Sequence, residues 1–185
     1  MKLSTLEGAR EEIGVMSSAD IFHKWQSNYQ TIAKQLATLT QEKKLPWIGP
    51  DMSAVSFAGA RLMEVWSHGQ TILDALGIKR QNSDNIRYIA ELGVKTFSWS
   101  FKGKGLPVPD VKPYIELTAP SGEIWCWNDP DTVHRITGSA EGFCQLVTQT
   151  RNVADTDLQV EGVIAKQWCD IAQCFAGAPS MPPAS

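Results

Sequence analysis

Two side chains that commonly bind metals stand four positions apart in the stretch 52–77, namely Glu64 and His68. On a helix, residues i and i+4 lie on one face, so this carboxylate and this imidazole point the same way. Each can supply one ligand to a divalent metal, whereas a catalytic zinc site takes three protein ligands and keeps one position open. The same spacing is also typical of a surface ion pair, so the pattern alone leaves both interpretations open.

Large apolar residues surround this pair in the sequence: Leu62, Val65 and Trp66. We therefore expect both groups of the pair to be partly desolvated. A buried carboxylate needs a hydrogen-bonded partner or a metal, because desolvation strongly disfavours an isolated charge. This environment favours a functional site over a surface ion pair.

Two arginines are candidates for contacting an anion. Arg61 lies one turn before Glu64, where it can either form a salt bridge with that carboxylate or bind an anionic substrate. Arg151 follows a predicted helix, where it can either bind an anion or stabilise the carboxyl end of that helix. The chain has no nucleophile motif, P-loop or dinucleotide-binding glycine motif, so no catalytic residue is assigned.

The elements that must position these residues follow from apolar periodicity. Three helices are predicted before residue 100: 18–43 with Ser18 or Asp20 as N-cap, 52–77, and a third from Ser83-Asp84 to about Phe97. A Gly/Pro-rich segment at 102–109 then indicates a linker. Beyond it, alternating residues predict a hairpin of strands 114–119 and 123–127 and two more strands at 132–137 and 157–161. Two helices are predicted at 140–148 and 163–175. The expected class is α+β, with a helical domain at 1–101, a small α+β domain at 110–177 and a disordered tail at 178–185.

Composition narrows the functional class. The chain has 185 residues, with 17 Lys and Arg against 20 Asp and Glu, a net charge of −3 that argues against a nucleic-acid partner. No apolar run approaches the roughly 20 residues that span a bilayer, and the N-terminus does not resemble a secretory signal. We therefore expect a cytoplasmic protein. Cys144 and Cys169 stand among large apolar residues and are predicted to be buried.

Longer segments carry a family resemblance. They read PWIGP at 46–50, ARLMEVWSHGQ at 60–70, LGVKT at 92–96, FCQLVTQ at 143–149 and DIAQCFAG at 170–177. Together they resemble an uncharacterised bacterial metal-binding family that is similar to the N-terminal metal-binding domain of mycothiol-dependent maleylpyruvate isomerase, within the DinB/YfiT-like group of helical bundles. The last half is also similar, less specifically, to sterol-carrier-like domains and to wyosine-base-formation domains.

The resemblance implies a metal site. In DinB-like bundles one histidine of an early helix and two residues of a later helix hold the metal, and Glu64 and His68 match the later pair. The early histidine has no counterpart here, and the resemblance places its helix upstream of Met1. The first domain is thus expected to be an incomplete bundle that leaves apolar residues bare, among them Phe57, Trp66 and the stripe around Trp25. A homodimer is the expected way to cover them.

In the resembled isomerase a divalent metal activates a low-molecular-weight thiol that attacks the substrate. The resemblance therefore implies a metal- and thiol-dependent isomerase or transferase with a small-molecule substrate. Zinc is the expected ion, Glu64 and His68 its ligands, and Arg61 or Arg151 the anion contact. One alternative is a non-catalytic binding protein with a degenerate metal site. A weaker alternative is a role in tRNA wyosine modification, which the acidic charge disfavours.

Overall fold

The structure, a computed structural model, describes residues 2–47, 51–178 and 180–183. The chain forms two compact units, Met1–Ala58 and Gly59–Ser185. The domain bounds expected from the sequence stay a prediction. Within the described residues, no helix combines the length and the apolar composition that crossing a bilayer requires.

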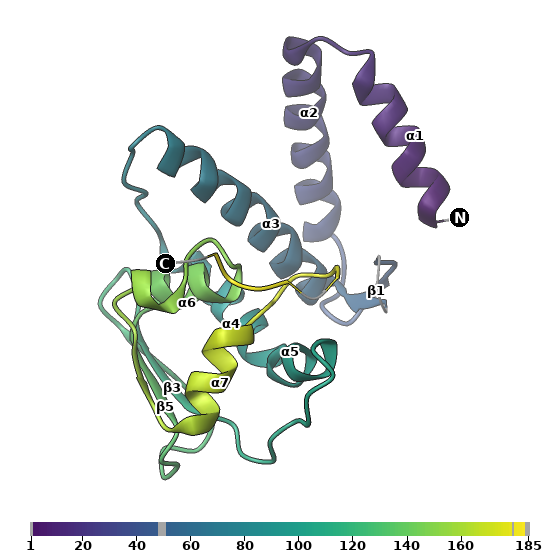
Figure 1. Ribbon diagram of the computed structural model, residues 1–185. Helices are drawn as coiled ribbons and strands as arrows, with labels where there is room; N and C mark the ends of the chain where they lie inside the picture. The colour runs from purple at the N-terminus through teal and green to yellow at the C-terminus, as the bar shows by residue number, and fades with distance from the viewer. Residues whose placement is uncertain (1, 48–50, 179, 184–185) are drawn as a thin grey trace. The chain divides into compact units, whose positions relative to one another are not determined.

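The first unit begins with a pair of helices, α1 (Lys2–Gly14) and α2 (Ser18–Ala37), which run antiparallel in Figure 1. An ion pair between Lys24 and Glu12 joins them. The N-cap of α2 is Ser17, whose Oγ accepts a hydrogen bond from the backbone N–H of Asp20 at 3.2 Å. Neither Ser18 nor Asp20 takes the predicted capping role. The sequence does not predict α1, because its residues form no apolar stripe.

Helix α2 ends at Ala37, short of the predicted 43, and a small two-stranded sheet follows. Strands β1 (Lys44–Leu45) and β2 (Met52–Ser53) pair antiparallel. Residues 48–50 lie outside the described residues, so the PWIGP segment is described only in part. Trp47 packs edge-on against Phe57, with 5.4 Å between ring centroids, and both residues are half-buried.

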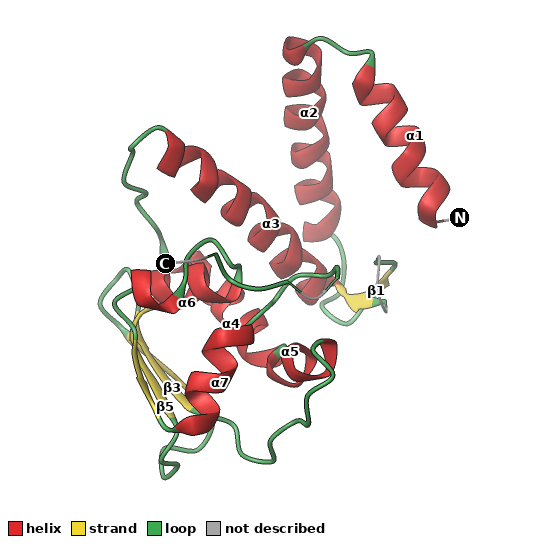
Figure 2. Cartoon of the chain, viewed as in Figure 1, coloured by secondary structure: helices red, strands yellow, loops and turns green. Residues whose placement is uncertain are grey.

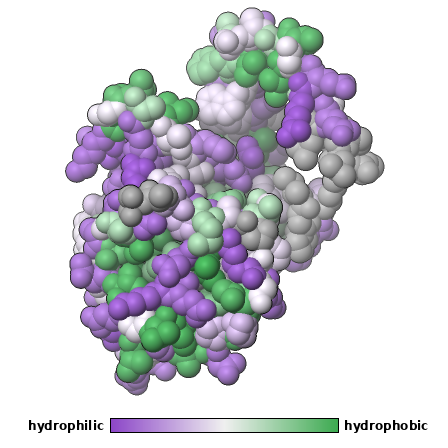
Figure 3. Space-filling model, viewed as in Figure 1, coloured by the Kyte–Doolittle hydropathy of each residue, from purple (hydrophilic) through white to green (hydrophobic). Residues whose placement is uncertain are grey.

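An aromatic stripe on α2 reaches the surface. Phe22, Trp25 and Tyr29 are each about half exposed, at 55%, 48% and 49%. Their rings contact one another, with centroids 6.1 Å apart for Phe22 and Trp25 and 5.2 Å apart for Trp25 and Tyr29. The prediction that the Trp25 stripe is bare is therefore confirmed. On the face drawn in Figure 3, hydrophobic residues likewise come to the surface between hydrophilic ones.

Helix α3 (Ala54–Ala75) lies within the predicted range 52–77 and carries the residues of interest. Trp66 on this helix is 3% exposed, so the expectation that it is bare is wrong. Its indole Nε1 donates a hydrogen bond to Asn82 Oδ1 at 2.8 Å, and the guanidinium of Arg80 lies 4.9 Å from its ring centroid. The loop after α3 therefore folds back over Trp66 and buries it.

The second unit continues with three short helices: η1 (Asp84–Ile86), α4 (Arg87–Lys95) and α5 (Phe97–Gly103). Helix α4 packs closely against α6 (Ala140–Val147), because Gly93 presents no side chain there. A Cβ atom at Gly93 would lie 2.9 Å from both γ-methyl groups of Val147 and 3.1 Å from Phe143 Cε1. Glycine at this position thus sets the separation of the two helices.

The second unit also holds a mixed sheet of order β4-β3-β5-β6. Its strands are β3 (Tyr114–Thr118), β4 (Ile124–Trp127), β5 (Arg135–Ser139) and β6 (Gln159–Glu161). Strand β3 pairs antiparallel with β4 and parallel with β5, and β5 pairs antiparallel with β6. Ile115, Leu117 and Ile136 are fully buried, as the alternating pattern predicts.

Helices α6 and α7 (Val163–Ile171) pack on the sheet, as Figure 2 shows, with the short helix η2 (Val153–Asp155) between them in sequence. Phe143 and Trp168 meet in the core at 5.9 Å between ring centroids, and Cys144 and Cys169 are buried beside them, as predicted. The predicted α+β class is confirmed. Near the C-terminus, Ser180 N donates to Gln173 Oε1 at 2.9 Å and Asn152 Nδ2 donates to Pro183 O at 2.9 Å.

Candidate functional site

Glu64 and His68 lie one turn apart on α3, with 3.5 Å between Glu64 Oε2 and His68 Nε2. The expected shared face is therefore present. The His68 side chain is 80% exposed and that of Glu64 is 30% exposed, so the expectation that both groups are desolvated is wrong for His68. Trp66 does not cover the imidazole, because residues two apart on a helix point to opposite sides.

The donor set around the pair accounts for two ligands of a divalent ion. No group of three or more His, Cys, Asp and Glu side chains able to hold a metal occurs among the residues that the structure describes. Cys174 is buried, and this burial is the main cause that raises the pKa of its thiol. The negative charge of the Glu64 carboxylate raises that pKa further.

Arg61 is exposed and makes no ion pair within the described part of the chain. Of the two alternatives for this arginine, the salt bridge to Glu64 does not form, since Glu64 pairs with His68 instead. Helical geometry places Arg61 about one turn before Glu64. Its guanidinium is thus free to contact an anion beside the pair.

Arg151 has a partner that the sequence does not predict. Its Nη1 and Nη2 donate to the two carboxylate oxygens of Asp74 at 2.7 and 2.6 Å, and Nη1 also donates to Thr150 O at 2.7 Å. The hydrogen bond from Arg151 is the main cause that lowers the pKa of Asp74, and the hydrogen bond to Asp74 is the main cause that raises the pKa of Arg151. An anion can reach this guanidinium only by displacing a bidentate carboxylate.

A buried amide supports the Asp74–Arg151 pair. Gln70 is 3% exposed, and its Nε2 donates to Asp74 Oδ1 at 2.9 Å. Its Oε1 is buried and has no hydrogen-bond partner among the residues that the structure describes. Asp74 and Arg151 stand 77 positions apart, so no local pattern could have connected them.

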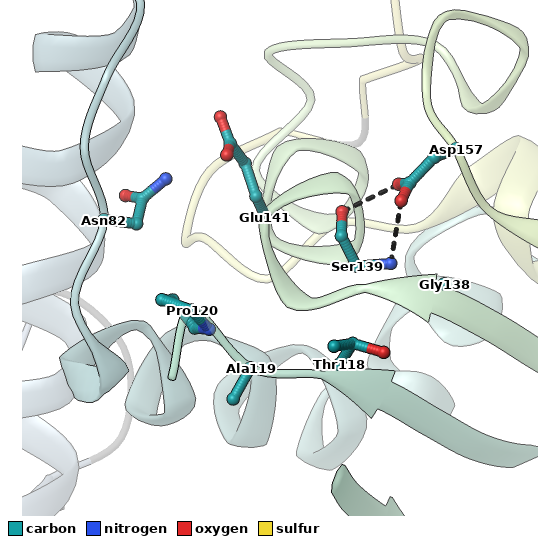
Figure 4. Close-up of a pocket in the computed structure, with 8 residues that line it drawn as sticks. All are labelled: Asn82, Thr118, Ala119, Pro120, Gly138, Ser139, Glu141 and Asp157. Carbon is teal, nitrogen blue, oxygen red and sulfur yellow. Dashed lines mark hydrogen bonds between the residues drawn. The ribbon is translucent and has the colours of Figure 1, made fainter. Parts of the chain in front are cut away.

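A pocket of about 450 Å³ lies elsewhere in the second unit, where the ends of β3 and β5 meet the start of α6 (Figure 4). Its walls combine small, polar and acidic residues: Asn82, Thr118, Ala119, Pro120, Gly138, Ser139, Glu141 and Asp157. The sequence does not predict this pocket, because its residues come from four separate segments that only the fold brings together.

Comparison with known proteins gives two findings. The family model of the mycothiol maleylpyruvate isomerase N-terminal domain matches residues 7–72, a range that includes Glu64 and His68. Two uncharacterized proteins from two strains of Mycobacterium tuberculosis are each 41% identical over 174 residues, which cover 94% of this chain and 68% of each relative. No solved structure matches the chain.

Proposed function

This chain belongs to the bacterial family that carries the mycothiol maleylpyruvate isomerase N-terminal domain, and we propose that Glu64 and His68 are two ligands of a divalent metal. The observation that carries the proposal is the geometry of the pair within the matched range: a carboxylate and an imidazole 3.5 Å apart on one helical face, with the imidazole 80% exposed. Zinc is the proposed ion, since it accepts both nitrogen and carboxylate ligands.

The proposed activity is a thiol-dependent isomerisation or transfer on a small anionic substrate. A bound divalent ion supplies a lowered thiol pKa, so that a low-molecular-weight thiol is a thiolate at neutral pH. Exposed His68 leaves the site open to solvent and to such a thiol. Arg61, one turn away and unpaired among the described residues, is the proposed contact for a substrate carboxylate. Arg151 is the weaker candidate, because Asp74 already occupies its guanidinium.

Zinc titration by calorimetry tests the metal proposal. We expect one zinc per chain in the wild type, and an affinity reduced at least about tenfold in Glu64→Gln and in His68→Ala, because each loses one ligand. His23→Ala is the matched control, since His23 is an exposed histidine on α2 outside the pair. Absence of zinc uptake by the wild type, or equal uptake by all four proteins, refutes the assignment.

A second candidate is a non-catalytic interaction protein that self-associates, and the aromatic stripe of Phe22, Trp25 and Tyr29 favours it. Exposed aromatic residues of this size are enriched at protein interfaces. Sedimentation should then detect a homodimer that Trp25→Ser weakens, whether or not zinc is present. A monomer at every concentration, with zinc uptake intact, favours the enzyme-like proposal instead.

A further inference from the structure

The 450 Å³ pocket in the second unit uses none of the residues proposed for the metal site. Figure 4 shows Glu141 and Asp157 on α6 and on the loop before β6, and Asn82 on a third segment across from them. Thr118, Ala119 and Pro120 form a floor at the end of β3. The volume lies within the usual range for sites that bind small molecules.

The Asp157 carboxylate is held in a fixed position. Its Oδ1 accepts a hydrogen bond from Ser139 Oγ at 2.7 Å, and its Oδ2 accepts one from Ser139 N at 3.1 Å, both drawn in Figure 4. Gly142 makes room for it, because a Cβ there would lie 2.5 Å from Asp157 Oδ1. Each carboxylate oxygen has two lone pairs, so both oxygens can accept a further hydrogen bond.

Glu141 is the second carboxylate of the wall. Its Oε1 accepts one long hydrogen bond, from Gln145 Nε2 at 3.3 Å, and Oε2 accepts none from the described residues. None of the eight lining residues is Lys, Arg or His, so the wall carries a formal charge of −2. Arg80 and Arg151 both interact electrostatically with Glu141, but neither lines the pocket. The lining thus favours a positively charged ligand over a neutral or anionic one.

Asn82 offers the pocket a hydrogen-bond donor, whereas the two carboxylates offer acceptors. Its Oδ1 accepts the hydrogen bond from Trp66 Nε1 at 2.8 Å, which fixes which end of the amide faces away from Trp66. Its Nδ2 is buried and finds no hydrogen-bond partner in the described part of the chain, and Figure 4 draws it on the side toward Glu141. A buried donor left unpaired is costly, so this nitrogen calls for an acceptor atom.

We propose that this pocket binds a small organic ammonium compound that also carries a hydroxyl oxygen. The ammonium group donates to Glu141 and Asp157, and the hydroxyl oxygen accepts from Asn82 Nδ2. A hydroxyl suits the site because it can accept from the amide and donate to a carboxylate at once. The proposal is independent of the metal site and holds whether or not zinc binds there.

The test is an NMR titration of the full chain, labelled with nitrogen-15, with 2-amino-1,3-propanediol as the probe. Glycerol is the matched control ligand, because it has the same shape with a hydroxyl in place of the ammonium group. We expect the amino compound to shift the amide signals of residues 138–142 and 157, and glycerol to leave them unchanged. Equal shifts with both compounds, or none with either, overturn the proposal.

Variants locate the binding in the pocket. Glu141→Gln and Asp157→Asn should each weaken binding of the amino compound about tenfold, since each removes a charge-assisted hydrogen bond. Asp157→Asn keeps one of the two acceptor oxygens that Ser139 uses, and Glu141→Gln leaves both Ser139–Asp157 hydrogen bonds in place, so the two variants perturb the fold differently. Glu91→Gln removes the same charge from an exterior ion pair on α4 and should bind as the wild type does. Equal weakening by Glu91→Gln, or tighter binding of calcium at the same signals, overturns the assignment.

Discussion

Replacing Gly93 by alanine should destabilise the second unit, although alanine is the better helix former. The added Cβ would stand 2.9 Å from both γ-methyl groups of Val147 and 3.1 Å from Phe143 Cε1. Val147 is 1% exposed and Phe143 fully buried, so neither has free space to move into. The two helices must separate, or Val147 must leave its rotamer.

Two opposing effects set the magnitude. Alanine in place of glycine inside a helix stabilises by about 1 kcal/mol. Overpacking a dense core costs about 1–3 kcal/mol. The steric cost falls in the upper part of that range here, because Val147 is stiff at χ1 and both of its methyl groups are blocked. We expect a net loss of about 1–2 kcal/mol in the free energy of unfolding.

Urea unfolding followed by tryptophan fluorescence measures this loss. Gly59→Ala is the matched control, since a Cβ on that α3 glycine meets nothing nearer than Tyr88 at 3.9 Å, and it should stabilise by up to about 1 kcal/mol. The double variant Gly93→Ala with Val147→Ala should be less destabilised than the sum of its single variants, because the clash is removed. Gly93→Ala as stable as Gly59→Ala would refute the close helix contact.

Three further outcomes follow from the ionisable groups. The Asp74 pKa is lowered in the fold, so Asp74→Asn should cost about 1 kcal/mol at neutral pH, and urea unfolding should find that cost fading as the pH falls through that lowered pKa. Cys126 is the exposed cysteine, while the other three are buried, and burial raises the pKa of Cys169 to about 12. A thiol reagent should therefore label one cysteine in the folded chain, and Cys126→Ser should abolish that labelling. Hydrogen bonding with Cys126 raises the pKa of Tyr114 to about 12, so an ultraviolet titration should contain a late step that Tyr114→Phe removes.

Apolar periodicity predicted most of the secondary structure, because burial selects one face of each element. The strand β3 and the helices α6 and α7 show this well, since their alternating or helical patterns match buried positions. Helix α1 was not predicted, because its residues form no apolar stripe. The predicted end of α2 lies beyond the observed one, because local propensity does not indicate where strand β1 begins.

The candidate sites also contain contacts that the sequence predicts and contacts that it does not predict. Glu64 and His68 are four residues apart, so helical geometry alone predicts that they meet. The expectation that Trp66 is bare was wrong, because Asn82 and Arg80 cover it from a loop whose path no local pattern reveals. The Asp74 partner of Arg151 escaped for the same reason.

By itself the sequence determined the α+β class, the family and the Glu64–His68 pair, all of which depend on residue type and on spacing along one element. The tertiary structure alone decided that His68 is exposed, that Asp74 occupies Arg151, and that Asn82, Glu141 and Asp157 line one pocket. The physical reason is the separation along the chain of the residues that interact. Periodicity reports on neighbours within a helix or strand, whereas charge pairing and pocket formation depend on segments that only the packed core holds together.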